Sequence, residues 1–158
     1  MTFIIRPARF PDAPALANLL LEVGGFSAII NHTPLEVTSQ IESQLAECLA
    51  DESHSVYISV DETDLLVGYI SVHWLAYLFM PGPEGFISEL FLLPIARGKG
   101  LGSMLMDAVK TEAVQRGAYR LSLLNGKNQE SYERGFYPKQ GWEERPDMAN
   151  FIYLIPDE

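Results

Sequence analysis

The stretch Pro94-Ile95-Ala96-Arg97-Gly98-Lys99-Gly100-Leu101-Gly102-Ser103 decides the fold of this 158-residue chain. It follows the apolar segment 86–93 and opens the amphipathic segment 101–116, so a strand, a glycine-rich turn and a helix start come in immediate succession. First turns of helices usually favour acidic side chains, which complement the positive end of the helix dipole. This turn holds Arg97, Lys99 and three glycines, and no acid. Because backbone N–H groups at such a helix start can hold an anion, we predict a phosphate site here.

Two well-known phosphate motifs do not fit this turn. A Walker loop needs Gly-x-x-x-x-Gly-Lys-Ser/Thr, but Lys99 is followed by Gly100. A dinucleotide loop needs Gly-x-Gly-x-x-Gly, and neither glycine frame of the turn has the third glycine. The pattern that remains is Arg-x-x-Gly-x-Gly, made by Arg97, Gly100 and Gly102. The alternative interpretation is a glycine-rich turn whose charges are only solvated.

Composition limits the class of protein. Apolar residues make up 47% and charged residues 20%, which is typical of a globular domain. The net charge of −10 disfavours a nucleic-acid surface, and it either attracts cationic amines or simply keeps the protein in solution. The apolar runs are too short for a membrane span or a signal peptide, so we expect a cytoplasmic protein without a membrane partner. Cys48 has helical spacing and is expected to pack in the core, and the scattered histidines predict no metal site.

The periodicity of the apolar residues predicts one α/β domain over residues 1–158, with a mixed central β-sheet flanked by helices on both faces. The expected strands are 3–7, 55–60, 65–74, 86–93, 119–124 and 150–155, and the expected helices are 12–23, 34–50, 98–116 and 129–140. Thr33, Pro34 and Glu36 form the signature of a capped start for the second helix. The early strands should pair antiparallel, whereas the strands on either side of helix 98–116 must pair in parallel.

The glycine turn (residues 97–103), with Pro94 three residues before Arg97, resembles the acetyl-coenzyme A (acetyl-CoA) pyrophosphate loop of the GNAT superfamily of N-acetyltransferases. The run Tyr137-Pro138-Lys139-Gln140-Gly141-Trp142 is similar to the family's Tyr-x-x-x-Gly-Phe signature, with Trp142 in place of Phe. The segment 5–13 also looks like the family's opening strand and helix, so the resemblance spans nearly the whole chain.

The resemblance also implies where the donor would bind. The glycine turn would anchor the diphosphate through Arg97, Gly98, Lys99, Gly100, Leu101, Gly102 and Ser103. The pantetheine arm would pair with the strand edge formed by Phe91, Leu92 and Leu93, with the backbone N–H of Leu92 polarising the thioester carbonyl. Asn128 matches the first position of the family's Asn-x-x-Ala motif, although Ser131 replaces Ala and Tyr137 lies further away than usual.

Two residues are the candidates for acid and base. Glu89 lies on the cofactor strand among apolar neighbours, which would raise its pKa towards that of a useful general base, or it orients the substrate. Glu84 and His73 are reserve bases. Tyr137 matches the family's general acid, which would protonate the leaving thiolate, or it is a buried core aromatic. Tyr132 is a weaker competitor for the same role.

The acceptor pocket is expected to include Phe26, Ile29, Tyr77 and Phe79, unless these residues only pack in the core or in a dimer interface. The function that the resemblance implies is direct transfer of an acetyl group from acetyl-CoA to a primary amine of a small molecule or peptide, in a ternary complex. The acceptor, the length of the acyl group and a homodimeric state stay open. The alternative is a non-catalytic acyl-CoA-binding or sensing module on the same fold.

Overall fold

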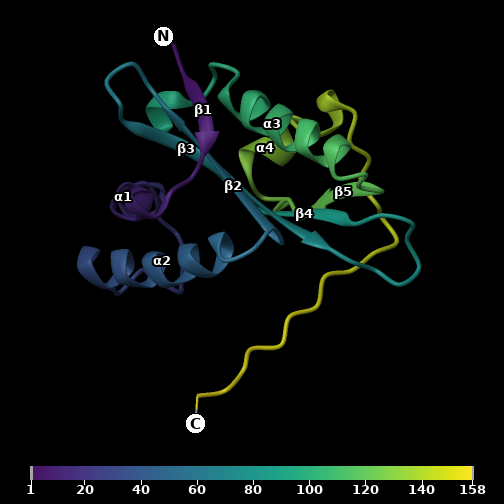
Figure 1. Ribbon diagram of the computed structural model, residues 1–158, viewed down its shortest axis with the longest axis horizontal. Coiled ribbons are helices and arrows are strands. Elements are labelled where there is room, and N and C mark those ends of the chain that lie inside the picture. Colours follow the sequence, from purple (N-terminus) through teal and green to yellow (C-terminus); the bar gives the residue numbers. More distant parts are fainter. Residues whose placement is uncertain (1, 158) are drawn as a thin grey trace. The chain divides into compact units, whose positions relative to one another are not determined.

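The computed structural model describes residues 2–157. Residues up to Leu123 form one compact unit and residues from Leu124 onward form a second, so a single domain over the whole chain stays a prediction. The first unit contains a five-stranded sheet of order β1-β2-β3-β4-β5 (Figure 1). Its strands are β1 Ile4–Pro7, β2 His54–Val60, β3 Leu66–Leu75, β4 Glu84–Leu92 and β5 Arg120–Leu123.

The pairing of the strands follows the prediction. Strands β1 to β4 pair antiparallel in sequence order, and β4 pairs with β5 in parallel. Helix α3 (Leu101–Gln115) makes the connection between these two parallel strands. Helices α1 (Ala13–Val23) and α2 (Pro34–Leu49) cover one face of the sheet, and α3 covers the other (Figure 1). The mixed sheet with helices on both faces is therefore confirmed.

The core forms where these layers meet. Strand β3 is buried along almost its whole length because helices cover it on both sides, and Ile58, Ile70 and Leu105 are fully buried. The start of α2 shows the expected capping box, in which Thr33 Oγ1 accepts from Glu36 N and Glu36 Oε1 accepts from Thr33 N, each at 3.2 Å. Caps of this kind fix where a helix begins, so the sequence signature was sufficient for this boundary.

A register shift divides β4 into two halves. Ser71 of β3 is opposite Glu89, but the next residue, Val72, is opposite Ile87, so Ser88 is the extra residue of a β-bulge. Strand β5 pairs only with Glu84–Ile87, the first half of β4. Within residues 2–157, the second half of β4 therefore has a ladder to β3 on one side and an open edge on the other.

Three predicted elements differ from the structure by more than two residues. The helix expected at 98 begins at Leu101, because the glycines before it adopt left-handed backbone angles. The helix expected over 129–140 is broken into a single turn, α4 (Glu130–Glu133), and a 3₁₀ turn (Pro138–Gln140), because Gly135 has φ +68° and Pro138 follows. The strand expected over 150–155 does not form, and these residues are exposed.

Candidate active site

The glycine turn presents backbone donors at the start of α3. Gly98 and Gly100 have φ values of +74° and +78°, which side-chain-bearing residues rarely adopt. The first helical hydrogen bond runs from Met104 N to Gly100 O at 3.1 Å, so the N–H groups of Leu101 and Gly102 precede it. No side chain caps this helix, in contrast to α2. Arg97 and Lys99 are exposed beside it, and the turn as a whole is suited to a diphosphate.

The open edge of β4 lies directly before this turn. Leu93 N donates to Val67 O at 2.8 Å, and Gly68 is opposite Leu92. In an antiparallel ladder the backbone groups alternate sides, so the N–H and C=O of Leu92 point away from β3 towards the open edge. The same alternation directs the N–H of Phe91 to β3 and places Leu90 on the open edge beside Leu92. Leu90 was not predicted, although the two-residue period of a strand could have indicated it.

Glu89 sits on the α1 and α2 face of β4. Burial raises the pKa of its carboxyl, and a smaller opposing effect comes from a hydrogen bond with Tyr69 on β3. This raised pKa is the direction that the apolar neighbours predicted. Cys48 of α2 is close enough that the Glu89 charge adds to burial in raising the pKa of the thiol. The sequence analysis missed Tyr69, which strand pairing places diagonally across from Glu89.

The two reserve bases differ in their surroundings. Glu84 is buried, and its carboxyl accepts from Arg120 Nε at 2.5 Å and from Tyr77 Oη at 2.9 Å. Burial alone would raise the pKa of Glu84, but these hydrogen bonds outweigh it and hold the pKa below its ordinary value. The lowered pKa favours the ionised carboxylate, held between Arg120 and Tyr77.

The surroundings of His73 favour its neutral form. Its Nε2 is 2.8 Å from Oγ of Ser88, the bulged residue next to Glu89, and its ring meets His54 edge-on at 4.4 Å between centroids. Burial, followed by the neighbouring His54, lowers the pKa of His73. A lowered pKa favours the neutral imidazole, which can accept a proton.

The predicted acceptor residues fall into two groups in the first unit. Phe26 meets Phe91 edge-on with ring centroids 4.9 Å apart, at an open pocket formed by the end of α1 and the loop after it. Ile29 lines the same pocket and is buried against Ala17 and Val37, so core packing already accounts for much of its side chain. Tyr77 and Phe79 stack on each other in the loop before β4, with 5.6 Å between centroids.

The second unit holds Tyr137, Tyr132 and Asn128. Tyr137 packs edge-on against Phe136 at 4.9 Å and Trp142 at 6.0 Å, and burial raises the pKa of its hydroxyl, which therefore stays protonated at neutral pH. The Tyr132 hydroxyl donates a hydrogen bond to Glu144 Oε1 at 2.8 Å, so its proton is already shared with that carboxylate. Asn128 is exposed in the turn before α4.

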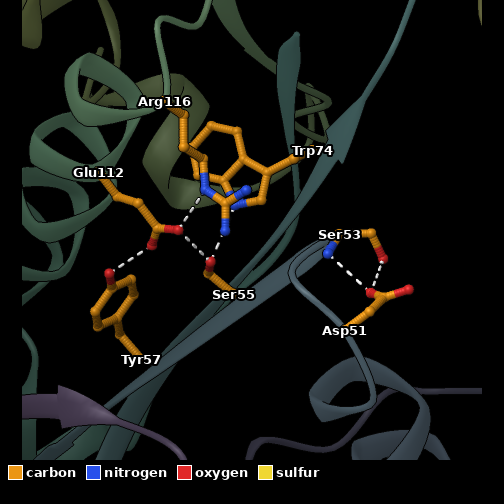
Figure 2. Close-up of polar contacts among 7 residues, drawn as sticks. All are labelled: Asp51, Ser53, Ser55, Tyr57, Trp74, Glu112 and Arg116. Atoms are coloured by element: carbon orange, nitrogen blue, oxygen red, sulfur yellow. Dashed lines mark hydrogen bonds and ion pairs between the residues drawn. The ribbon is translucent and has the colours of Figure 1, made fainter.

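A polar network fastens the far end of α3 to the sheet (Figure 2). Glu112 accepts hydrogen bonds from Ser55 at 2.7 Å, from Tyr57 at 2.5 Å and from Arg116 at 2.6 Å. Burial raises the pKa of Glu112, but the three donors outweigh it and lower the pKa. The Arg116 guanidinium also lies 4.9 Å from the ring centroid of Trp74. The network thereby positions the helix that carries the glycine turn. The sequence analysis missed this network, although the spacing of Glu112 and Arg116 by four residues could have indicated the ion pair.

Comparison with known proteins agrees with this geometry. Residues 25–142 match the acetyltransferase (GNAT) family. The chain is 27% identical over 154 residues to YhfO of Bacillus subtilis (strain 168), an uncharacterized N-acetyltransferase, covering 96% of this chain and 97% of that protein. Two crystal structures share the fold: a transcriptional regulator from Bacillus halodurans C-125 (TM-score 0.81, 18% identity, 96% and 100% coverage) and a ribosomal-protein-alanine N-acetyltransferase from Brucella melitensis biovar Abortus 2308 (TM-score 0.71, 18% identity, 98% and 100% coverage).

The chain therefore belongs to the GNAT family of acetyltransferases, and we class it as an N-acetyltransferase. The resemblance drawn from the glycine turn and the Tyr137 segment is confirmed at the level of the family. Among the described residues, no helix is both long and apolar enough to cross a membrane.

Proposed function

We propose that the protein transfers an acetyl group from acetyl-CoA directly to a primary amine of a small molecule or a peptide, within a ternary complex. The observation that carries this proposal is the continuity of β4 and α3. The open edge with its outward Leu92 N–H leads straight into a turn with backbone N–H groups at a helix start and two exposed cations. An extended pantetheine arm can pair with such a strand edge, and the diphosphate attached to it can bind at the helix start that follows.

In the proposed donor site, the N–H groups at the start of α3, with Arg97 and Lys99, hold the diphosphate. Leu90 and Leu92 pair with the amides of the pantetheine arm as a neighbouring strand would. The Leu92 N–H donates to the thioester carbonyl oxygen, where negative charge develops as the amine adds to the carbonyl carbon. A donor in that position is worth about 3 kcal/mol in the transition state.

Glu89 and Tyr137 supply the proposed proton transfers. An amine with a pKa near 10 is neutral in only about one molecule in a thousand at pH 7, so a general base that takes its proton raises the supply of reactive amine. The carboxylate of Glu89 accepts that proton, and its raised pKa makes it a stronger base. The C–N bond forms, the C–S bond breaks, and the Tyr137 hydroxyl gives its proton to the leaving thiolate. The second proton that the nitrogen loses on becoming an amide passes through solvent to the Tyr137 oxygen and restores the hydroxyl, and Glu89 releases its proton to solvent. His73, with its lowered pKa, is the second candidate base.

The proposal includes a cytoplasmic location and leaves the acceptor as a class. The Brucella structure is named a ribosomal-protein-alanine N-acetyltransferase, which favours including alanine-terminated peptides among the amines tested. The Bacillus halodurans structure is named a transcriptional regulator, which favours keeping a non-catalytic acyl-CoA sensor as the second candidate function.

The test is release of free thiol from acetyl-CoA in the presence of amines and peptides. We expect release that depends on one acceptor class, and we expect Glu89→Gln and Tyr137→Phe each to lower kcat at least tenfold while acetyl-CoA still binds. Tyr132→Phe is the matched control for Tyr137→Phe, because its hydroxyl is committed to Glu144. Binding of acetyl-CoA without acceptor-dependent release from any acceptor would favour the sensor. Thiol release from longer acyl-CoA molecules but not from acetyl-CoA would show that the acyl group transferred is longer than acetyl.

A further inference from the structure

The open pocket formed by the end of α1 and the loop after it has an apolar lining. The described residues that line it are two glycines and five large apolar residues, Leu20, Leu21, Phe26, Ile29 and Ile30. A charged group placed against these side chains would lose water without gaining a partner, whereas a hydrocarbon group gains free energy with each methylene that it buries. The pocket is therefore suited to an apolar, uncharged group.

The backbone of the loop holds the pocket in shape. Gly24 and Gly25, with φ values of +72° and +84°, end α1 and let the chain turn. In the turn that follows, Ile29 N donates to Phe26 O at 3.1 Å. The side chain of Ile29 is buried in a cluster with residues of α1 and α2, which ties the loop to the core. A ligand thus meets a pocket that is already formed, and its affinity is not reduced by the cost of ordering the loop.

Phe26 connects the pocket with the open edge of β4. Its ring meets the ring of Phe91 edge-on, with 4.9 Å between centroids. Phe91 directly precedes Leu92, whose N–H is proposed to hold the thioester carbonyl. The ring of Phe91 also lies 5.9 Å from that of Tyr69, whose hydroxyl is hydrogen-bonded to Glu89. An amine nitrogen placed between Glu89 and the thioester can therefore extend its carbon chain past the Phe26 ring into the pocket.

We propose that the acceptor is a primary amine with an apolar, uncharged substituent, an alkylamine or arylalkylamine, and that this substituent binds in the pocket. The inference rests on the proposed function, because Glu89 and the Leu92 N–H determine where the reacting nitrogen lies. A carboxylate beside the amino group is disfavoured for two reasons: the lining side chains give it no hydrogen bond, and the net charge of −10 repels it. The same net charge attracts the ammonium form of the amine, which then gives its proton to Glu89.

A homologous series of amines tests the pocket. Ethylamine, butylamine and hexylamine have nearly the same basicity, so differences among them report the contact of the carbon chain with the protein rather than the supply of neutral amine. With acetyl-CoA as the donor, we expect kcat/KM to rise about two- to fourfold for each added methylene until the pocket is filled. Phenethylamine should have a kcat/KM about tenfold or more above that of free phenylalanine, which carries an additional carboxylate.

Two positions provide matched variants for this series. Ile30 lines the pocket and is 64% exposed, so Ile30→Asp places a carboxylate there without opening the core. Leu35 is 82% exposed in the first turn of α2 and is not among the residues that line the pocket, so Leu35→Asp adds the same charge elsewhere. We expect Ile30→Asp to remove the dependence on chain length and Leu35→Asp to keep it, with an unchanged circular dichroism spectrum in both. Equal loss of the dependence in both variants overturns the inference.

Binding of the same amines to the protein saturated with coenzyme A, measured by calorimetry, separates this inference from the proposed function. Affinity that rises along the series without any thiol release would contradict acetyl transfer and still support the pocket. Binding and release that are independent of chain length, or phenylalanine used as well as phenethylamine, overturn the inference. So does release that rises with the length of an acyl-CoA donor and loses this rise in Ile30→Asp, because the pocket then holds the acyl chain.

Discussion

At the scale of single residues, Glu89 owes its chemistry to its position on a strand half-covered by helices. Burial raises the pKa of its carboxyl above the ordinary value of 4.5 in the folded protein. The folded state therefore binds this proton more tightly than the unfolded chain, and stability falls as pH rises from about 4.5 through the folded pKa. We expect Glu89→Gln, which stays neutral, to gain stability relative to the natural chain across this window. Urea unfolding of both proteins between pH 4 and pH 8 measures the difference, and parallel curves would contradict it.

Gly100 allows a second prediction at this scale. Its φ of +78° costs a residue with a Cβ about 1 kcal/mol, so Gly100→Ala should lower the stability by about that amount. The strain also turns the first N–H groups of α3 away from a bound diphosphate, and we expect acetyl-CoA to bind at least tenfold more weakly by calorimetry. Gly117→Ala is the matched control, because Gly117 also has a positive φ, +64°, but follows the other end of α3. Equal losses of affinity in both variants would show that the turn plays no part in binding.

The residues that sequence predicted best are those with local signatures. The glycine turn and the Thr33 capping box are set by neighbours a few positions away, so their spacing is visible in the chain. Two other contacts have no local signature in the sequence. Tyr69 lies beside Glu89, and Ser88 lies beside His73, only because the register of the sheet brings residues of different strands together. That register includes a bulge at Ser88, which shifts every later pair by one and has no local signature.

At the scale of elements, the Glu112 network determines how firmly α3 is held on the sheet. Glu112→Gln removes the charge from three hydrogen bonds, each of which is worth about 1.5–3 kcal/mol when one partner is ionised, and we expect a loss of about 2 kcal/mol at pH 7. Because the folded pKa of Glu112 is lowered, its contribution is present above the ordinary value of 4.5 and disappears as pH falls through the folded pKa. The two proteins should thus converge in acid. Asp107→Asn, at an exposed position of the same helix, should change the stability by less than about 0.5 kcal/mol.

The elements that were predicted wrongly fail for two physical reasons. The segment 129–140 has enough helix-forming side chains, but Gly135 and Pro138 interrupt the backbone hydrogen bonding. The backbone restrictions of these two residues outweigh the helix propensity of the others. The segment 150–155 has the composition of a strand, but a strand needs a partner for its N–H and C=O groups. The composition of a segment indicates that it can pair as a strand, but it does not show where the partner strand lies.

At the scale of the whole molecule, one edge among the described residues differs from the two outer edges of the sheet, because it opens in the middle of a strand. The bulge at Ser88 separates the second half of β4 from β5, and this opening accounts for the proposed donor site. This edge is followed directly by a turn of cations and glycines. The backbone groups that would otherwise pair with a neighbouring strand are, in the proposed function, the groups that bind the pantetheine arm.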